Sequence, residues 1–275
     1  MTGEEQAAAL RANIAAYDRL DEAGYINGAP HLKHDSVAKI YRSLVDAAIE
    51  GIGRPPENIS VLELGAGSGL ASSPWFEHKV SLTAVDPSES MLRSLSARAA
   101  GYGLKPTQVV SDALDFLESS DQTFDVITHV SMLHHVPDYM GLLTRSAARV
   151  KSGGCLLTFQ DPLRYDRMPL GHHFAERAAY FIWRTGQGNV KRGLKTRLRR
   201  LRGVYSQSEV VDFDEYHVVR NGVDSVAIIG LLGMSFAKVH AVSYWSTYSR
   251  MLQTLGRCLH LASSFGILAS GRKSS

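Results

Sequence analysis

Short apolar runs and amphipathic stretches alternate through the middle of the chain. Each run has the length and the nearly continuous apolar character of a strand covered on both faces; the runs lie at 60–64, 81–85, 107–110, 124–129 and 155–160. The stretches between them favour helices at 71–78, 89–100, 113–118 and 138–150, the last expected to stop at Gly153 and Gly154. Strands that alternate with helices form right-handed βαβ units, so we expect an α/β fold built on a parallel sheet.

The pattern changes at the two ends. Helices are expected at 6–20 and from about Ser36 up to the glycine and proline residues at 51–56, ahead of the first strand. Residues 161–221 are rich in Arg, Tyr and Gly and lose the alternation. A helix at 223–232 and strands at 236–243 and 264–269 follow, with a mixed segment between the two strands.

Composition narrows the classes of protein. The chain is 44% apolar and 21% charged, which is ordinary for a globular protein, and its net charge of +3 does not call for nucleic acid. Cys155 and Cys258 match no metal or redox spacing, so we expect no metal site and a reducing, cytoplasmic compartment. The start of the chain lacks the apolar stretch of a signal peptide, and the apolar run at 226–236 is too short to span a bilayer.

A glycine-rich turn follows the first expected strand. Residues 61–70 read VLELGAGSGL, with glycines at 65, 67 and 69. Glycine lets the backbone turn sharply and lets a ligand approach main-chain N–H groups, so such a turn between a strand and a helix is typical of nucleotide sites. The dinucleotide fingerprint has its third glycine where Leu70 stands, which disfavours NAD and FAD, and the turn lacks the Lys-Ser/Thr ending of a P-loop.

This stretch resembles motif I of the class I S-adenosylmethionine-dependent methyltransferases, and later motifs resemble their small-molecule branch. The resemblance covers about 56–160 and 222–272. It implies an α/β three-layer sandwich with a seven-stranded, mostly parallel sheet, the last strand antiparallel, plus helical cover segments. The expected divisions are an N-terminal helical cover at 1–55, a core that binds S-adenosyl-L-methionine at 56–160, a basic insertion or lid at 161–221, and completion of the sheet at 222–275.

Asp86 ends the second expected strand, about twenty residues past the first glycine. A carboxylate at that place can accept two hydrogen bonds from a ribose diol, and charge-assisted bonds of this kind are comparatively strong. The alternative is an ordinary Asp-Pro turn before a helix that Ser88 would cap. We expect the ribose contact because position, spacing and residue type agree.

The resemblance implies roles for further residues. Glu63 would order the glycine loop and face the amino end of the methionine moiety, or else be a structural acid with partners of its own. Asp112 would accept a hydrogen bond from the adenine amino group, or it would cap the next helix. Met91 would pack on the adenine, or only in the core. The complete cofactor set expected is Glu63, Gly65, Ala66, Gly67, Gly69, Asp86, Pro87, Met91, Asp112, Ala113, Val130 and Ser131.

The fourth strand leads into a Leu-His-His sequence that resembles the motif IV region of small-molecule methyltransferases. In that family the backbone around Val130 and Ser131 borders the transferring methyl group. Histidine titrates near neutral pH. His134 or His135 is therefore expected to act as a general base or to bind the acceptor, and a capping or packing role is the alternative.

Two later stretches are candidates for acceptor binding. Arg164 and Tyr165 follow the fifth strand and could line a substrate pocket, with Tyr17 from the first helix; a salt-bridged loop is the alternative. Residues 191–202 predict an amphipathic helix with a basic face. It is interpreted as a lid helix, with a patch for an anionic substrate or a membrane surface, or an RNA track, as alternatives.

These features predict methyl transfer from S-adenosyl-L-methionine to a small molecule, at oxygen before nitrogen or carbon. The missing N-P-P-[YF] motif disfavours N-methylation of amides or adenine. An RNA methyltransferase and a non-methylating S-adenosylmethionine-binding protein are the alternatives. Nucleic acid is not an expected partner, a homodimer is compatible with the sequence, and natural-product biosynthesis is the expected setting.

Overall fold

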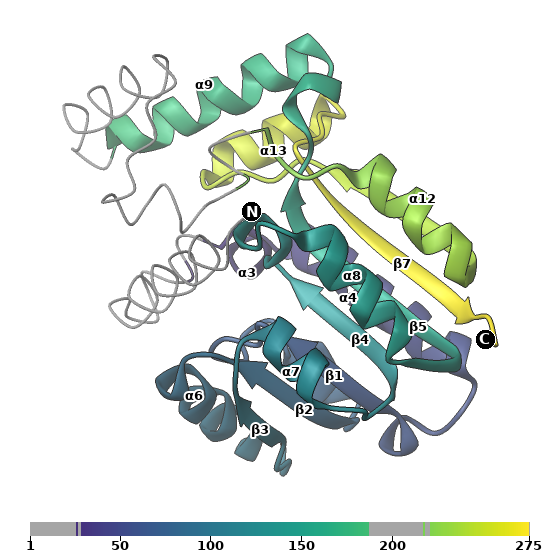
Figure 1. The fold of residues 1–275 in the computed structure, drawn as a ribbon. Helices are drawn as coiled ribbons and strands as arrows, with labels where there is room; N and C mark the ends of the chain where they lie inside the picture. Colours follow the sequence, from purple (N-terminus) through teal and green to yellow (C-terminus); the bar gives the residue numbers. More distant parts are fainter. Residues whose placement is uncertain (1–25, 27–28, 187–216, 218–220, 275) are drawn as a thin grey trace.

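One sheet of seven strands carries the fold, and the computed structural model describes residue 26, residues 29–186, residue 217 and residues 221–274. The strands lie in the order β3-β2-β1-β4-β5-β7-β6. Their bounds are Ser60–Leu64 (β1), Ser81–Asp86 (β2), Thr107–Val110 (β3), Phe124–Val130 (β4), Val150–Pro162 (β5), Phe236–Tyr244 (β6) and Ser264–Arg272 (β7). β1 to β5 pair in parallel, and β7 is antiparallel to both β5 and β6 (Figure 1). The predicted α/β fold and its antiparallel last strand are confirmed.

Helices cover both faces of the sheet. Their bounds are Pro30–Lys33 (α3), Asp35–Ile52 (α4), Ser73–Glu77 (α5), Glu89–Ala100 (α6), Ala113–Ser119 (α7), Tyr139–Ala148 (α8), Leu170–Gly186 (α9), Ser225–Ser235 (α12) and Arg250–Cys258 (α13). Single 3-10 turns lie at Pro56–Asn58 (η1), Leu133–His135 (η2) and Tyr165–Arg167 (η3). The buried residues of α4, α5 and α6 form one core cluster with the sheet, and those of α7, α8 and α12 form the other.

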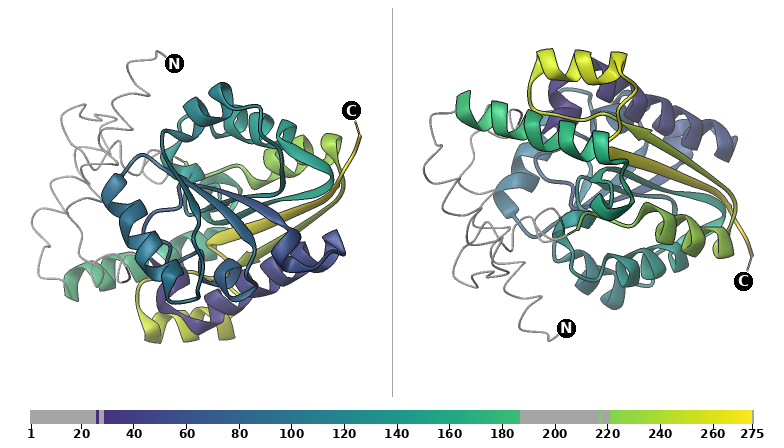
Figure 2. Two further views of the ribbon diagram at one scale, coloured as in Figure 1. Left: turned by 90° about the horizontal axis from the view of Figure 1, so that it is seen from below. Right: turned by 90° about the horizontal axis from the view of Figure 1, so that it is seen from above.

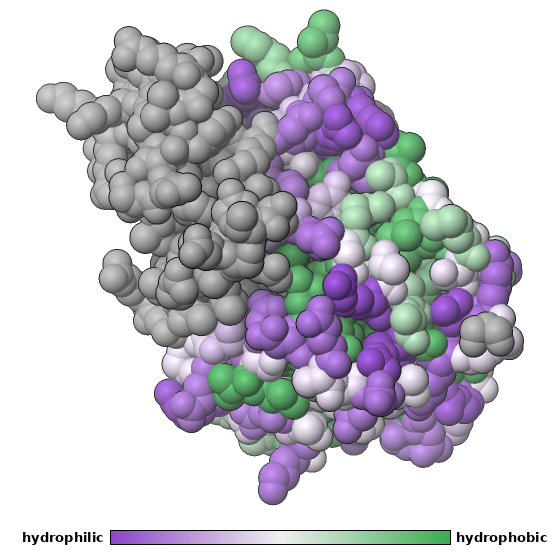
Figure 3. Space-filling model, viewed as in Figure 1, coloured by the Kyte–Doolittle hydropathy of each residue, from purple (hydrophilic) through white to green (hydrophobic). Residues whose placement is uncertain are grey.

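Two helices lie beyond the carboxyl ends of the parallel strands. α9 and α13 run side by side there when the molecule is viewed from above (Figure 2), and the N–H of Ala262, just after α13, donates to Nδ1 of His172 in α9 at 3.3 Å. α12 instead packs Ile228 and Leu232 onto the sheet and leaves Met234 exposed, and apolar atoms show over this helix in Figure 3. No helix in the described part of the chain is long and apolar enough to cross a membrane.

Side-chain caps explain where several helices begin. Ser88 accepts the N–H of Met91 at the start of α6, and Asp112 accepts the N–H of Leu114 at the start of α7, as the sequence suggested for both. Each bond satisfies a backbone donor that the first helical turn leaves without a partner. α4 ends where Gly53 takes a left-handed conformation at φ 68°.

One expectation about the elements was wrong. α8 ends at Ala148, before Gly153 and Gly154, and these glycines lie inside β5. A Cβ on Gly154 would come within 2.5 Å of the Asp125 carbonyl oxygen, so the residue permits close approach of β5 to β4 rather than ending a helix. Within residues 161–221, expected to be a basic insertion or lid, the chain forms α9, directly after Pro169.

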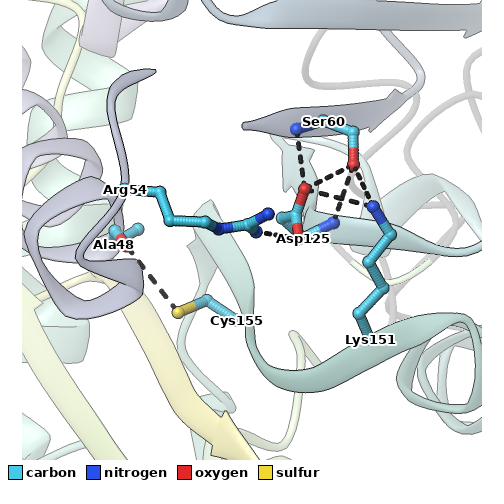
Figure 4. A network of polar contacts seen from close by, with 6 residues as sticks. All are labelled: Ala48, Arg54, Ser60, Asp125, Lys151 and Cys155. Carbon is cyan, nitrogen blue, oxygen red and sulfur yellow. Dashed lines mark hydrogen bonds and ion pairs between the residues drawn. The ribbon is translucent and has the colours of Figure 1, made fainter. Parts of the chain in front are cut away.

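A buried carboxylate ties together the ends of the strands opposite to the glycine turn. Asp125 in β4 accepts from the N–H and Oγ of Ser60 at 2.9 and 2.7 Å and from Nζ of Lys151 at 3.2 Å, and it pairs with Arg54 (Figure 4). Burial alone would raise the pKa of Asp125, but the bonds from Ser60, Arg54 and Lys151 together lower it to about 2. The cluster therefore stabilises the fold while the carboxylate is ionised.

We expect Asp125→Asn to lower the free energy of unfolding at neutral pH by roughly 1–3 kcal/mol, measured by urea unfolding. The folded-state pKa of about 2 lies below the ordinary value of 3.8, so this contribution is present above the ordinary value and disappears as the pH falls towards the folded one. The deficit of the variant should therefore shrink in acid.

Asp121→Asn is the matched control, because the exposed Asp121 carboxylate pairs with Arg149 at the surface and should contribute little. An Asp125→Asn deficit that keeps its full size through the acid range would contradict the assignment.

Candidate functional site

The glycine turn follows β1 and is hydrogen-bonded to the carboxyl end of β2. Gly65, Gly67 and Gly69 all have positive φ, at 70°, 52° and 75°, a conformation that other residues seldom adopt. The N–H groups of Gly65 and Ala66 donate to the Val85 carbonyl at 2.9 and 3.1 Å. The turn is therefore fixed at the carboxyl edge of the sheet, where parallel α/β folds bind ligands.

Close packing leaves no room for larger residues at two of these glycines. A Cβ on Gly65 would lie 3.0 Å from Sδ of Met132, and one on Gly69 would lie 2.7 Å from Cγ of Leu95. Met132 follows β4 and Leu95 belongs to α6. The glycines thus serve the local packing as well as the backbone conformation.

Asp86 lies directly beside the turn. One carboxylate oxygen, Oδ2, accepts the N–H of Gly67 at 2.8 Å, and the other, Oδ1, accepts the N–H of Ser88 at 2.9 Å. The carboxylate therefore links the turn after β1 to the start of α6. This is the place at which an acid could meet a ribose.

Glu63 is a buried acid on the strand that enters the turn. It is 1% exposed and accepts a hydrogen bond from the hydroxyl of Ser72, which lies just past the turn. Burial raises the pKa of Glu63 to about 7; the Ser72 bond opposes this shift and the negative charge of Asp86 adds to it. The side chain connects β1 to the segment after the turn, which fits the ordering role expected for it.

The other residues expected around the adenine follow β2 or lie at the starts of α6 and α7. Asp112 caps α7, accepting the N–H of Leu114 at 2.8 Å, so the capping role is present; burial raises its pKa. Met91 and Ala113 are buried at the beginnings of α6 and α7, and Pro87 is half-buried directly after Asp86. All of them follow the carboxyl ends of their strands.

The chain leaves β4 through a strained residue. Val130 is the last residue of the strand and is buried, and Ser131 has a φ of 53°. The N–H of Ser131 donates to the Phe159 carbonyl in β5 at 2.7 Å, which holds this conformation. Positive φ at a non-glycine residue is uncommon, and such strain concentrates at functional sites.

The next turn, η2, places His134 on a buried acid. Its backbone N–H and its ring Nδ1 both lie on Oδ1 of Asp161, at 3.0 and 2.8 Å. Burial lowers the pKa of His134 and raises that of Asp161. The ring of His135 lies with its centroid 4.0 Å from that of His134. Among the described residues, no group of three or more His, Cys, Asp or Glu side chains could hold a metal ion.

Sequence reasoning did not single out Asp161, His31 or His217. Asp161 occupies the carboxyl end of β5, beside η2, and its position next to His134 could have been inferred from that strand end. His31 in α3 is buried and close enough to His134 for their charges to interact. The N–H of His217 donates to the His134 carbonyl at 2.8 Å. The last two contacts join distant segments, and no local pattern signals them.

Arg164 and Tyr165, the two candidates for binding the methyl acceptor that lie in the described part of the chain, have partners of their own. Arg164 donates to Asp166 at 2.8 and 2.9 Å and to Asp224 at 2.8 Å, which is the salt-bridged loop held open as the alternative. Tyr165 stacks on His173 with the ring centroids 5.3 Å apart. Tyr17 and the basic stretch at 191–202 lie outside the described residues.

A comparison with protein families identifies the domain that carries this arrangement. Residues 62–156, from β1 into β5, match a family model described as "Methyltransferase domain". This segment is similar to methyltransferase domains. The match contains the glycine turn, Asp86, Asp112 and His134, and it confirms the family that the sequence motifs indicated.

Curated relatives match this chain over part of their length. A protein named ubiquinone biosynthesis O-methyltransferase from Rhizobium rhizogenes is 32% identical over 117 residues, covering 40% of this chain and 47% of the relative. One of the same name from Coxiella burnetii is 35% identical over 96 residues, covering 35% of this chain and 41% of the relative. The chain therefore spans less than half the length of these relatives.

Among solved structures, the fold is similar to that of the N-methyltransferase NodS from Bradyrhizobium japonicum WM9, solved in complex with S-adenosyl-l-homocysteine. The TM-score is 0.56 at 13% identity, and the alignment covers 98% of this chain and 100% of that chain. At this identity the likeness concerns the fold alone. The similarity of fold extends well beyond residues 62–156.

We expect Gly69→Ala to destabilise the protein by roughly 1–3 kcal/mol, because alanine meets both an unfavourable φ and the Leu95 side chain. Gly51→Ala is the matched control: Gly51 lies in α4 with nothing within 4 Å of a Cβ, so the change should be neutral or stabilising. Chemical unfolding of both variants measures the contrast. Equal effects would show that the turn tolerates side chains.

Proposed function

We propose that this protein transfers a methyl group from S-adenosyl-L-methionine to a hydroxyl group of a small molecule. One observation carries the proposal: a turn with three positive-φ glycines is bonded to Asp86 at the carboxyl edge of the sheet, inside a methyltransferase domain. The curated relatives are named as O-methyltransferases, which supports oxygen as the attacked atom.

The residues at the turn fit the methyl donor. No side chain projects from the three glycines of the turn, so a ligand can approach its backbone, and Asp86 supplies carboxylate oxygens for a ribose diol. Glu63 would lie towards the amino end of the donor, and Met91, Asp112 and Ala113 towards its adenine. When bound, S-adenosyl-L-methionine supplies a methyl group already activated by a sulfonium centre.

The acceptor would lie at the end of β4, where His134 would act as the general base. The hydroxyl proton moves to the ring of His134, and an oxygen electron pair forms the new bond to the methyl carbon. The carbon–sulfur bond breaks, and its electron pair stays on sulfur. Alignment of donor and acceptor provides much of the rate, and the base helps where the acceptor proton must leave.

Several expectations from the sequence stay part of this proposal. We retain Tyr165 as a candidate acceptor contact, the lid role of 161–221, a cytoplasmic location, a homodimer and a setting in natural-product biosynthesis. The alternatives are an RNA methyltransferase and a protein that binds the donor without transfer. Light scattering measures the oligomeric state.

Asp86→Ala should weaken binding of S-adenosylhomocysteine by roughly 1–3 kcal/mol, measured by titration calorimetry, because it removes acceptors for charge-assisted hydrogen bonds. Asp46→Ala is the control, since Asp46 lies on α4 and pairs with His78, which follows α5, and it makes no contact with the turn among the hydrogen bonds and ion pairs of the described residues. Unchanged affinity in Asp86→Ala would remove this residue from the donor site. Tighter binding of NAD than of S-adenosylhomocysteine by the wild type would contradict the whole proposal.

Transfer is tested with methyl-labelled S-adenosyl-L-methionine and three acceptor panels: phenols, aromatic carboxylic acids and RNA. We expect labelled phenols. Labelled RNA would favour the RNA enzyme, particularly if its binding weakened steeply with salt. Donor binding without label in any panel would favour the non-methylating alternative.

A further inference from the structure

The contact between His134 and Asp161 fixes which ring nitrogen carries a proton. Oδ1 of Asp161 accepts the backbone N–H of His134, which can only donate, so this oxygen acts as an acceptor. Above the pKa of Asp161, which burial raises to about 7, this oxygen carries no hydrogen of its own, so Nδ1, 2.8 Å away, must donate. In a neutral ring, that leaves Nε2 without a proton and able to take one.

Two buried polar atoms near this pair have no partner within the described part of the chain. They are Oδ2 of Asp161 and Nδ1 of His31. Asp161 is 0% exposed and His31 is 4% exposed. A buried polar atom without a hydrogen bond costs roughly 1–3 kcal/mol, so such atoms need an explanation, and a ligand is one.

We propose that Asp161 is the positioning residue of His134 and that, together with His31, this pair forms a binding site for an uncharged hydroxyl acceptor rather than a carboxylate. The proposal rests on the methyl transfer proposed above and names the acceptor class of that same site. Nε2 of His134 takes the hydroxyl proton. Oδ2 of Asp161 and Nδ1 of His31 offer hydrogen bonds to polar groups of the acceptor.

Charge decides against a carboxylate. Above its pKa, which burial raises to about 7, Asp161 contributes a negative charge in a buried place; burial lowers the pKa of His31 to about 3, a shift that the nearby His134 increases, so His31 supplies no compensating positive charge in that range. The guanidinium groups of Arg164 and Arg167 are paired with Asp166 and Asp224. An anionic acceptor would meet repulsion there, whereas a neutral phenol or alcohol would not.

Asp161 acts on His134 in two ways. It holds the ring in the tautomer that exposes a basic Nε2, and its negative charge stabilises the imidazolium that forms when the proton arrives. His135, His217 and Tyr244 also interact electrostatically with Asp161, so their charges influence the protonation of the His134–Asp161 pair. Because burial raises the pKa of Asp161, the active form should be lost as the pH falls through a range above that of an ordinary carboxyl group.

The kinetic test compares Asp161→Asn with Asp125→Asn, a buried aspartate at the opposite end of the sheet. We expect Asp161→Asn to lower kcat towards phenols roughly a hundredfold or more, to abolish the acid limb of the pH profile, and to leave S-adenosylhomocysteine affinity within about twofold. Asp125→Asn should keep its rate and its pH profile. His31→Leu should raise the acceptor KM about tenfold and change kcat less.

A second measurement does not depend on any acceptor. Nitrogen-15 NMR of histidine-labelled wild type should show His134 neutral at pH 8 with its proton on Nδ1, and Asp161→Ala should lose that preference. A proton on Nε2, equal loss of rate in the two asparagine variants, or faster methylation of benzoates than of neutral phenols would overturn the proposal. Absence of S-adenosylhomocysteine binding in the wild type would instead count against the methyl transfer itself, while the tautomer would still decide the role of Asp161.

Discussion

The central strands of a sheet covered by helices on both faces give their polar side chains little access to water, and each buried carboxyl group must find partners inside the protein. Three acids meet this constraint in different ways. Asp125 receives donors from Ser60, Arg54 and Lys151, and its pKa is low. Glu63 has Ser72 as a partner and a raised pKa. Asp161 uses one oxygen on His134 and keeps the other unsatisfied within the described chain. Completeness of hydrogen bonding thus separates a structural acid from candidate functional ones.

The same constraint explains why the two ends of the central strands differ. At the amino end of β4, Asp125 closes a fully bonded cluster that holds β1, β4 and β5 together. The carboxyl end instead holds the glycine turn, the positive-φ residue Ser131 and the His134–Asp161 pair. Strained backbone and hydrogen-bonding groups are therefore concentrated at this end. The stabilising cluster and the candidate site therefore lie at opposite ends of the same strands.

The sequence anticipated those parts that depend on local pattern. Continuous apolar runs gave the strands, Ser88 and Asp112 signalled two helix starts, and glycine spacing located the turn. The misassigned parts depend on tertiary contacts. Gly154 resembles a helix stop but allows the close approach of β5 to Asp125. The contact of His31 with His134 crosses about a hundred residues, and no periodicity reports such a distance.

The irregularity in β5 has a consequence for how such a protein can change over evolution. Phe159 pairs with Gly266 but Asp161 pairs with Phe265, so Gln160, at φ 69°, is an extra residue in the ladder and Asp161 takes the face that residue 160 would have in an unbroken strand. β1 and β2, which hold the glycine turn, do not pair with β5. Gain or loss of one residue here would therefore exchange the side chains at the proposed acceptor site while the glycine turn keeps its register, so under the proposed function a new acceptor preference could arise without rebuilding the proposed donor site.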